Sequence, residues 1–378
     1  MSFDLKKFDK TINLNKKKDL KIESKWELVK LEGVCDVKKG TSITKKDVSS
    51  GNIPVVAGGI NFAYYHNKAN REYPVITVSA SGANAGFINF WNQDIFASDC
   101  TTLKSTKDNL LNRYLYLFLK SEQNIIYLLK KVQTQPHVYP EDLKNFRMPL
   151  PPLEVQQKIV DKIGEVEKNE QEKSQRIKKS QDKIREICKI DGVKTKLSHL
   201  SQMTKRGKSP KYGFSKVQII KSGQVRGLYD FDFSSKHYVS KDFILDERKL
   251  TRGDLLINST GTGTAGRVNL FDLEGDFVVD SHITIVRLDK ERILPKFALY
   301  QLWSLGFDNI EKMATGQSGQ IEISKEIIEN ISISVPSVDK QKEIVEEIEL
   351  LEQKIKSSQD YLNNVKNLKQ NILDKHLK

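Results

Sequence analysis

The sequence predicts an α+β protein in which two mixed α/β segments are joined by two long helices that pair as an antiparallel coiled coil. Its 378 residues are about two and a half times the usual length of one domain. The chain also repeats itself, because residues 151–163 (PPLEVQQKIVDKI) and residues 336–348 (PSVDKQKEIVEEI) share proline, glutamine and apolar positions at a constant offset of 185. A helical periodicity follows each copy of this motif.

Weaker echoes of the repeat precede each motif in the same order. Val75 to Phe90 (VITVSASGANAGFINF) resembles Leu255 to Leu270 (LLINSTGTGTAGRVNL), and Arg113 to Ser121 (RYLYLFLKS) resembles Lys296 to Ser304 (KFALYQLWS). One structural unit is therefore expected twice.

After each motif, apolar residues recur in alternating steps of four and three, as in a helix with one apolar seam. Glu, Lys and Gln dominate the other positions, and neither segment contains an internal proline. The predicted coiled-coil seam consists of Ile159, Ile163, Val166, Ile177, Ile184 and Ile187 in the first helix and of Ile344, Ile348, Leu351, Ile355, Leu362, Val365 and Ile372 in the second.

The length of these helices favours pairing with each other. A helix from Leu153 to Asp191 would be roughly 58 Å long, and a stripe of that length needs an equally long partner. The alternative is two ordinary amphipathic helices, each packed on its own segment. Pro151, Pro152 and Pro336 suit helix entrances, and Gly192 suits a helix stop. Antiparallel pairing is preferred because it relates the two halves by an approximate two-fold axis.

The predicted domain boundaries follow from these patterns. They give a lysine-rich extension over residues 1–20, a first globular segment over 21–150, a first long helix over 151–192, a second globular segment over 193–335 and a second long helix over 336–378. Short β-rich runs are expected at Pro54 to Ala57, Val75 to Ser79, Gly86 to Phe90, Leu255 to Asn258, Phe277 to Val279 and His282 to Leu288. One apolar-striped helix is expected in each segment, at Asn112 to Lys131 and at Pro295 to Met313.

Charge points to a class of partner. The chain has 62 Lys and Arg against 49 Asp and Glu, a formal charge of +13, which favours nucleic acid and leaves an acidic membrane surface or an acidic protein as alternatives. The three cysteines, Cys35, Cys100 and Cys188, lack C-x-x-C spacing and suit a reduced cytoplasm. No export signal and no apolar run of about 18 residues is present, so we expect the protein to be neither exported nor embedded in a membrane, and no membrane is among its predicted partners.

Enzyme signatures are weak. Residues 261–266 (GTGTAG) match G-x-G-x-x-G, but a strand-like run follows where a dinucleotide site needs a helix, so a hairpin tip is predicted. Asp242, Glu247 and Lys249 loosely imitate a nuclease triad, as chance allows in a chain with 29% charged residues. The sequence has no phosphate-binding G-x-x-x-x-G-K-S/T loop, no N/D-P-P-Y/F methyltransferase stretch and no histidine spacing typical of a metal site. No catalytic residue and no metal site is predicted.

Binding chemistry is better represented, because both segments place cations beside polar and aromatic loops of the kind that contact phosphates and base edges. Glutamine can pair with adenine, and lysine or arginine with guanine. The candidate DNA-binding residues are Lys38, Lys39, Lys45, Lys46, Tyr65, Lys68, Arg71, Gln133, Gln135 and His137 in the first segment and Lys205, Arg206, Lys208, Lys211, Tyr212, Arg226, Gln317, Ser318 and Gln320 in the second.

The motif P-P-L-E-x-Q-x-x-I-V and its second copy P-S-V-D-x-Q-x-x-I-V, each of which closes a β-rich segment and opens a long helix, resemble the specificity subunit of type I restriction-modification systems. Ser337 departs from the pattern, where the first copy has Pro152. The resemblance implies that each globular segment is a target recognition domain for one half of a bipartite DNA sequence. It further implies that the helices are spacers.

The same resemblance implies partners and cofactors. Two methyltransferase subunits and further restriction/translocase subunits would join this chain on double-stranded DNA in the cytoplasm. S-adenosylmethionine, ATP and Mg are expected on those subunits, and none on this chain, which would not be an enzyme itself. Two alternatives stay open: the recognition part of a single-chain restriction enzyme, which needs a nuclease or methyltransferase sequence on the same chain, and a coiled-coil adaptor for acidic proteins.

Overall fold

The structure is a computed structural model that describes residues 22–132, 135–316 and 321–378. The chain forms two compact units, Met1–Glu172 with Tyr361–Lys378, and Lys173–Asp360. We call residues 22–150 the first lobe and residues 193–335 the second lobe. The predicted extension over residues 1–20 and the candidates Gln133, Gln317, Ser318 and Gln320 lie outside the described residues.

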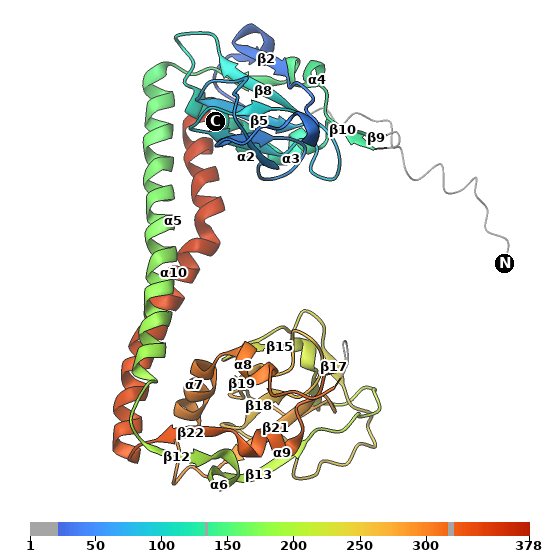
Figure 1. Ribbon diagram of the computed structural model, residues 1–378, viewed down its shortest axis with the longest axis vertical. Helices are drawn as coiled ribbons and strands as arrows, with labels where there is room; N and C mark the ends of the chain where they lie inside the picture. Colours follow the sequence, from blue (N-terminus) through green and yellow to red (C-terminus); the bar gives the residue numbers. More distant parts are fainter. Residues whose placement is uncertain (1–21, 133–134, 317–320) are drawn as a thin grey trace, which may run out of the picture. The chain divides into compact units, whose positions relative to one another are not determined.

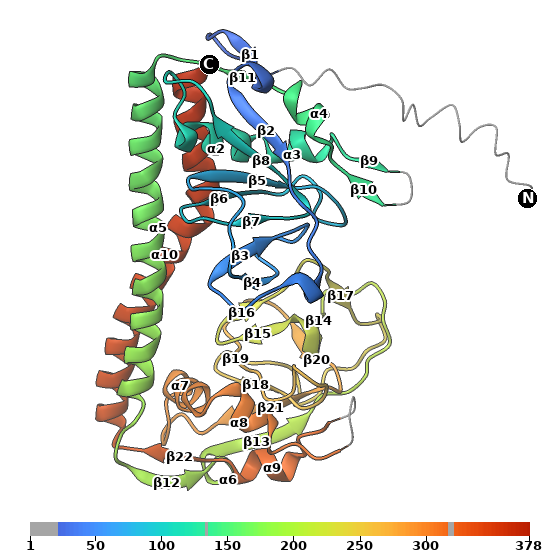
Figure 2. The same ribbon diagram turned by 45° about the horizontal axis from the view of Figure 1, so that its top comes forward.

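The first lobe is built on two small sheets (Figure 2). A four-stranded antiparallel sheet has the order β2 (Cys35–Lys39), β8 (Cys100–Ser105), β5 (Val75–Ser79), β6 (Ile88–Trp91), and a three-stranded sheet has the order β4 (Tyr64–His66), β3 (Ile53–Val56), β7 (Phe96–Ala97). In the second sheet β3 pairs with β7 in parallel. The remaining elements are β1 (Leu28–Lys30) paired with β11 (Arg147–Pro149), β9 (Lys131–Val132) paired with β10 (Pro136–His137), the helices α2 (Asn112–Ser121), α3 (Gln123–Tyr127) and α4 (Pro140–Lys144), and the 3-10 turns η1 (Leu31–Gly33) and η2 (Lys45–Asp47).

The second lobe repeats the strand order of both main sheets. Its four-stranded sheet has the order β13 (Ser201–Arg206), β21 (Ile283–Leu288), β18 (Leu255–Asn258), β19 (Val268–Leu270), and its three-stranded sheet has the order β17 (His237–Tyr238), β14 (Gln218–Ile220), β20 (Phe277–Val279). As in the first lobe, one pair of the smaller sheet, β14 and β20, is parallel. The remaining elements are β12 (Val193–Lys196) paired with β22 (Ser332–Val335), β15 (Val225–Gly227) paired with β16 (Asp230–Phe231), the helices α6 (Leu197–Leu200), α7 (Pro295–Leu305), α8 (Phe307–Glu311) and α9 (Lys325–Asn330), and the 3-10 turn η3 (Ser222–Gln224).

The central strands explain why the sequence forms these sheets. Every residue of β5 (VITVS) and of β18 (LLIN) is buried. A strand that is covered on both faces reads as a continuous run without polar alternation. The predicted bounds of both strands, and of β20, are confirmed, and the other predicted runs differ from the observed strands by one or two residues at their ends.

We predicted one continuous helix at Asn112 to Lys131 and one at Pro295 to Met313. This is wrong in one respect, because the structure has two consecutive helices in each place, α2 and α3 in the first lobe and α7 and α8 in the second. Gly306 has a φ of 88°, a left-handed conformation that ends α7 before α8 begins. In the first lobe, the side chain of Gln123 accepts a hydrogen bond from the Ile88 N–H (3.1 Å) and donates one to the Gly86 carbonyl (2.7 Å). This anchors the start of α3 to the turn before β6.

The two long helices are α5 (Leu153–Ile187) and α10 (Val338–Leu377). The predicted end of the first helix at Asp191 is wrong, because the Lys189 N–H bonds back three residues to Glu186 and the chain then enters β12. Gly192 serves a different purpose from the predicted stop. A Cβ atom there would lie 2.9 Å from the Val335 carbonyl carbon, so glycine allows the close approach of β22.

The helices pair in antiparallel fashion, as predicted. Within the first unit, Lys369 of α10 contacts Glu170 (3.0 Å) and Glu167 (3.7 Å) of α5, and Lys162 of α5 lies 3.2 Å from His376. The residue number therefore rises along one helix as it falls along the other. In Figure 1 the C-terminal end of α10 lies beside the start of α5.

The seam also continues into the cores of the lobes. Ile159 and Ile163 belong to one buried cluster with Leu115 of α2 and Leu373 of α10, while Ile184 is buried with Leu299, Ile344 and Ile348. Packing on a lobe and pairing with the other helix thus occur together at the helix ends. Of the predicted seam, the buried residues are Ile159, Ile163, Ile184, Ile344, Ile348 and Val365, and the half-buried ones are Val166, Ile177, Ile187, Leu351, Ile355, Leu362 and Ile372.

The N-terminal end of the first lobe closes α10. Trp26 donates its indole N–H to the His376 carbonyl (2.7 Å), and the backbone N–H of Lys25 donates to the Leu377 carbonyl (2.9 Å). Carbonyls in the last turn of a helix have no partner within the helix, so these bonds satisfy two of them. They also fix the chain directly before β1.

Candidate nucleic-acid interface

The glycine-rich segment of the second lobe is a hairpin tip, as predicted. Gly261, Gly263 and Gly266 all have φ between 74° and 95°, and the strands on either side, β18 and β19, pair in antiparallel fashion. The N–H of Gly263 donates to the Glu311 carboxylate (2.7 Å). Because no helix starts at this turn, it lacks the helix N-terminus that binds a dinucleotide pyrophosphate.

In the first lobe, several candidate cations extend from the surface. Lys38 and Lys39 are exposed on β2, Lys46 is exposed on η2, and Lys68 is exposed after β4. Lys38 forms an ion pair with Asp36. No carboxylate of the described residues pairs with Lys39, Lys46 or Lys68. These three ammonium groups can therefore meet phosphate oxygens without first leaving a protein carboxylate. Lys45 is the first residue of η2.

Arg71 has a mainly internal role in the structure. Its guanidinium donates to the Thr102 hydroxyl (2.8 Å), to the Asn70 carbonyl (2.7 Å) and to the Lys39 carbonyl (2.9 Å). These bonds connect the segment after β4 to strands β2 and β8. The arginine thereby holds the backbone that carries Lys39.

Aromatic rings accompany the cations of the first lobe. Tyr65 is 49% exposed, and its ring centroid lies 4.7 Å from that of Phe62. On β10, the His137 ring stacks on Tyr139 with a centroid distance of 5.8 Å and an interplanar angle of 22°. Gln135 is exposed directly before β10. The exposed rings of Tyr65 and Tyr139 offer stacking surfaces for bases.

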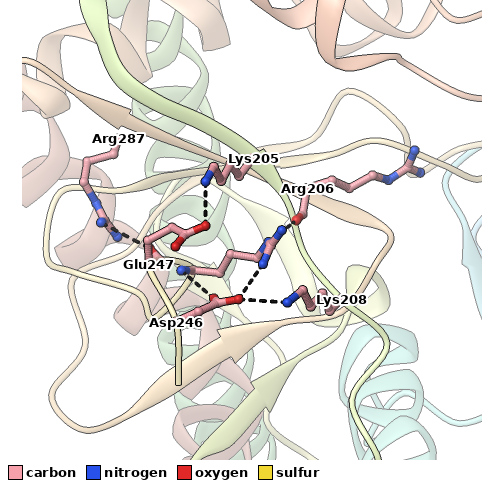
Figure 3. A network of polar contacts seen from close by, with 7 residues as sticks. Lys205, Arg206, Lys208, Asp246, Glu247 and Arg287 are labelled. Atoms are coloured by element: carbon pink, nitrogen blue, oxygen red, sulfur yellow. Dashed lines mark hydrogen bonds and ion pairs between the residues drawn. The ribbon is translucent and has the colours of Figure 1, made fainter. Parts of the chain in front are cut away.

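In the second lobe, two of the candidate cations, Lys205 and Lys208, are held by carboxylates of the segment before β18 (Figure 3). Lys205 bonds to Glu247 (2.5 Å), Lys208 bonds to Asp246 (2.9 Å), and Arg248 also bonds to Asp246 (2.5 Å). The Arg248 Nε donates to the carbonyl of Arg206 (3.0 Å). Arg206 itself forms an ion pair with Glu322. We call this set of residues the charged network: Lys205, Arg206, Lys208, Asp246, Glu247, Arg248 and Glu322.

The network keeps its carboxylates ionised. Burial alone would raise the pKa of Asp246, but hydrogen bonds from the Lys208 side chain and the Arg248 backbone, with the charges of both residues, lower that pKa to about 2. The hydrogen bond from Lys205 is the main cause that lowers the pKa of Glu247. A phosphate that approaches this surface must therefore compete with carboxylates for the same cations.

Of the remaining described candidates of the second lobe, Lys211 and Tyr212 lie in the loop between β13 and β14, and Arg226 lies on β15. Lys211 is exposed, and its carbonyl accepts the Ser240 N–H (2.8 Å). Tyr212 is 58% exposed and lies 5.7 Å, ring to ring, from His237. Arg226 is bound to Asp232 (2.7 Å), and this hydrogen bond is the main cause of the lowered pKa of that carboxyl.

The structure also reveals residues that the sequence reasoning missed. Phe214, in the loop before β14, and Ile244, in the segment between β17 and β18, expose 90% and 86% of their surface. Phe214 lies in a loop that also carries Lys208, Lys211 and Lys216. This mixture of aromatic and basic residues is the sequence feature that could have identified Phe214 as a candidate DNA-binding residue. Large apolar side chains on a basic surface can insert between base steps.

The weak nuclease-like triad separates into unrelated contacts. Glu247 pairs with Lys205, and Lys249 pairs with Asp276 (2.6 Å). Within the described ranges, no three His, Cys, Asp or Glu side chains are arranged to hold a metal ion.

The cysteines are buried thiols. Burial raises the pKa of Cys35 and of Cys100 to about 12 and that of Cys188 to about 11, so these thiols are poor nucleophiles at neutral pH. In the part of the chain that the structure describes, no helix has the length and hydropathy needed to cross a bilayer.

Comparison with known proteins connects this architecture to one family. Residues 23–179 and 181–367 both match the family described as type I restriction modification DNA specificity domain. A putative type I restriction enzyme specificity subunit of Haemophilus influenzae is 24% identical over 312 residues, which cover 77% of this chain and 78% of that protein.

Two solved structures share the fold. The S subunit of a type I restriction-modification system from M. genitalium has a TM-score of 0.61 at 18% identity and covers 95% of this chain and 98% of its own. A chain from a study of assembly and conformational transition of the type I system has a TM-score of 0.62 at 16% identity, with coverage of 94% and 99%. With both of its halves matched, the chain belongs to the type I restriction-modification DNA specificity family.

Proposed function

We propose that the two lobes are target recognition domains, each of which reads one half of a bipartite DNA target. The observation that supports this most directly is the repeated strand order, β2-β8-β5-β6 and β13-β21-β18-β19, combined with loops of different sequence. A shared scaffold with different loops suits two readers that bind different bases. The proposed recognition domains cover residues 21–150 and 193–335, and their proposed contacts are the candidate residues described above.

We further propose that the long helices act as a spacer over residues 151–192 and 336–378. Helix α5 continues without interruption for 35 residues, which corresponds to about 52 Å. Two paired helices are stiffer than a single one, so they can fix how much unread DNA separates the half-sites. In this proposal the gap is measured by distance and is not read as sequence.

The chemistry is assigned to partners. Methyltransferase subunits, two in our proposal, would dock on the coiled coil and bring S-adenosylmethionine to target adenines, and restriction/translocase subunits would add ATP-driven cleavage. The support is family membership and the names of the relatives. This chain would choose the site at which those subunits act.

Genomic methylation tests the proposal. The chain is co-expressed with the methyltransferase encoded beside it, and adenine methylation is mapped across the genome. We expect one two-part motif with a fixed unspecified gap. A contiguous motif, or methylation unaffected by deletion of this chain, would contradict the proposal. The alternative function, an adaptor for acidic proteins, predicts a different result: a competitor duplex that carries the target sequence would not displace the bound partner.

A change in helix length tests the spacer. Four residues are inserted after Glu170 of α5, with a matched insertion beside its partner Lys369 in α10 so that the antiparallel contacts can re-form. The insertion adds roughly 6 Å. This is between one and two base steps of about 3.4 Å. The methylated motif should keep its half-sites and gain a longer gap, and an unchanged gap would contradict the spacer.

A further inference from the structure

A buried glutamine joins the first lobe to the start of α5. Gln156 has no exposed surface. Its side-chain oxygen accepts the Leu111 N–H (2.9 Å), and its amide donates to the carbonyls of Asn109 (2.8 Å) and Pro151 (2.8 Å). Leu111 is the residue at the N-terminal boundary of α2 and has no side-chain cap of its own. Gln156 therefore supplies from α5 the acceptor that the start of α2 lacks.

The second lobe repeats this contact. Gln341 of α10 is fully buried, accepts the Leu294 N–H (2.8 Å) and donates to the carbonyls of Arg292 (3.1 Å) and Pro336 (3.1 Å). Leu294 lies at the N-terminal boundary of α7. The same three hydrogen bonds thus recur in two lobes whose sequences otherwise differ widely.

A second contact lies further along each helix. Arg113 of α2 forms an ion pair with Glu167 of α5, and Lys296 of α7 bonds to Glu352 of α10 (2.7 Å). In both copies the carboxylate follows the glutamine by 11 residues, and the cation follows the leucine by two. Eleven residues make about three helical turns, roughly 16 Å.

Each ion pair is supported by further groups. The Arg113 guanidinium lies 5.2 Å from the ring centroid of Phe90, and Lys369 of α10 approaches Glu167 within 3.7 Å. In the second lobe Lys296 also bonds to Glu349 (3.0 Å), and the Tyr300 hydroxyl bonds to Glu352. Both pairs are half-buried, where screening by salt is weaker than at an open surface.

From these repeated contacts we propose that Gln156 with Glu167, and Gln341 with Glu352, are positioning residues that set the angle between each lobe and its long helix. One contact would leave the lobe free to pivot, whereas two contacts three turns apart define a direction. This inference rests on the proposed function. If the helices set the gap, then the angle at which a lobe leaves its helix contributes to the gap, and loosening it should relax the gap length while the bases read stay the same.

Four substitutions test the inference in the full chain co-expressed with its methyltransferase: Glu167→Gln, Glu352→Gln, Gln156→Met and Gln341→Met. Glu165→Gln and Glu346→Gln are matched controls. These two carboxylates are exposed on the same helices, and their substitution removes the same charge as the glutamate variants. The measured quantity is the ratio of methylation at sites whose gap differs by one base pair to methylation at sites with the wild-type gap. We expect this ratio to rise about tenfold in the four variants, a factor equal to about 1.4 kcal/mol of lost discrimination, and to stay unchanged in the controls.

The outcomes separate positioning from simple stability. A residue with a merely structural role lowers methylation at all gaps together and leaves the ratio unchanged, which would overturn the inference. Loss of all methylation in both glutamate variants would overturn it as well. If the wild-type chain shows no two-part motif, the proposed function has failed and not the positioning alone.

Discussion

The two lobes share a strand order but differ in how they hold positive charge. On the first lobe, Lys39, Lys46 and Lys68 are exposed, and no described carboxylate pairs with them. On the second lobe, Lys205 and Lys208 are bonded to Glu247 and Asp246. At these positions the same backbone scaffold presents cations without a described carboxylate partner in the first lobe and paired cations in the second. Each lobe has an exception, because Lys38 of the first lobe pairs with Asp36 and Lys211 of the second has no carboxylate partner among the described residues.

This difference shows that a count of lysines overestimates the charge available to DNA. A free lysine that meets a phosphate releases counterions, which makes binding salt-dependent. A lysine that is already paired must exchange a protein carboxylate for a phosphate, so it contributes less binding free energy. We therefore expect the first lobe to contribute more of the salt-dependent affinity for DNA. In the second lobe, we expect the ion pairs to hold Lys205 and Lys208 in fixed orientations.

The lobes also differ in their cores. Asp254, directly before β18, is 1% exposed and bonds to Arg287 through two contacts of 2.8 and 2.9 Å. Pro74 occupies the matching place directly before β5. A buried charge that loses its partner is costly. Among the described residues, no ion pair of the first lobe has a carboxylate as deeply buried as Asp254.

The largest expected effect follows from this pair. Asp254→Ala should destabilise the second lobe by about 3 to 5 kcal/mol, because Arg287 is left without its carboxylate in a partly buried position. Hydrogen exchange of the full chain should show reduced protection in β18 and β21, with β5 and β8 unchanged. An equal reduction in both lobes would show that they unfold as one unit, and no reduction would contradict the importance of the pair.

The next effect concerns the free cations. Alanine at Lys39, Lys46 and Lys68 together should reduce the slope of log K against log salt by roughly 0.9 for each phosphate that is no longer neutralised, and should weaken binding to any duplex by about 100-fold. The matched variant replaces Lys205 and Lys208, which are paired, and should change the slope by less than half as much per residue. Equal slope changes in the two variants would contradict the comparison of the lobes.

A smaller effect is expected from releasing cations of the charged network. Asp246→Asn removes the carboxylate that binds both Lys208 and Arg248. Binding to unrelated duplex DNA should tighten about fivefold, since an exposed ion pair is worth up to roughly 1 kcal/mol. The measurement is a fluorescence titration at low salt, with Glu274→Gln as the control, because this exposed carboxylate of the second lobe forms no ion pair with the described residues. Weaker binding in Asp246→Asn would indicate that the carboxylate orients its cations for DNA.

How far the sequence predicts the structure depends on the range of the interactions. The repeat at offset 185 and the heptad pattern predict the two long helices, because periodicity is a local property. Their antiparallel pairing was predicted from the approximate two-fold relation between the repeated halves. The break between α2 and α3 was missed, since Gln123 is anchored by backbone groups more than 30 residues away. The sequence repeat identifies Gln156 and Gln341 as equivalent positions. It does not predict their hydrogen-bond partners, which are backbone groups near Leu111 and Leu294.

The candidate interface shows the same limit. The lysines of the second lobe were found from composition, whereas their pairing partners lie 38 to 42 residues further along the chain. Glu247, which in the sequence loosely imitates part of a nuclease triad, is the partner of Lys205. Pairing of side chains is a tertiary property, so the sequence could locate the cations but could not tell which of them are free. Which residues contact DNA stays a prediction.

The smallest expected effect concerns pH and distinguishes the paired lobe from the free one. Because the pKa of Asp246 is about 2 in the folded chain and its ordinary value is near 4, the ionised carboxylate stabilises the fold fully above about pH 4. This contribution is lost as the pH falls from about 4 to 2. The free energies of unfolding of the wild type and of Asp246→Asn, measured by urea titration, should differ by roughly 0.5 kcal/mol at pH 5 and converge toward pH 2. A difference that is constant from pH 5 to pH 2 would mean that the Asp246 carboxylate is not held ionised by Lys208 and Arg248, and the contrast between the two lobes would lose its electrostatic basis.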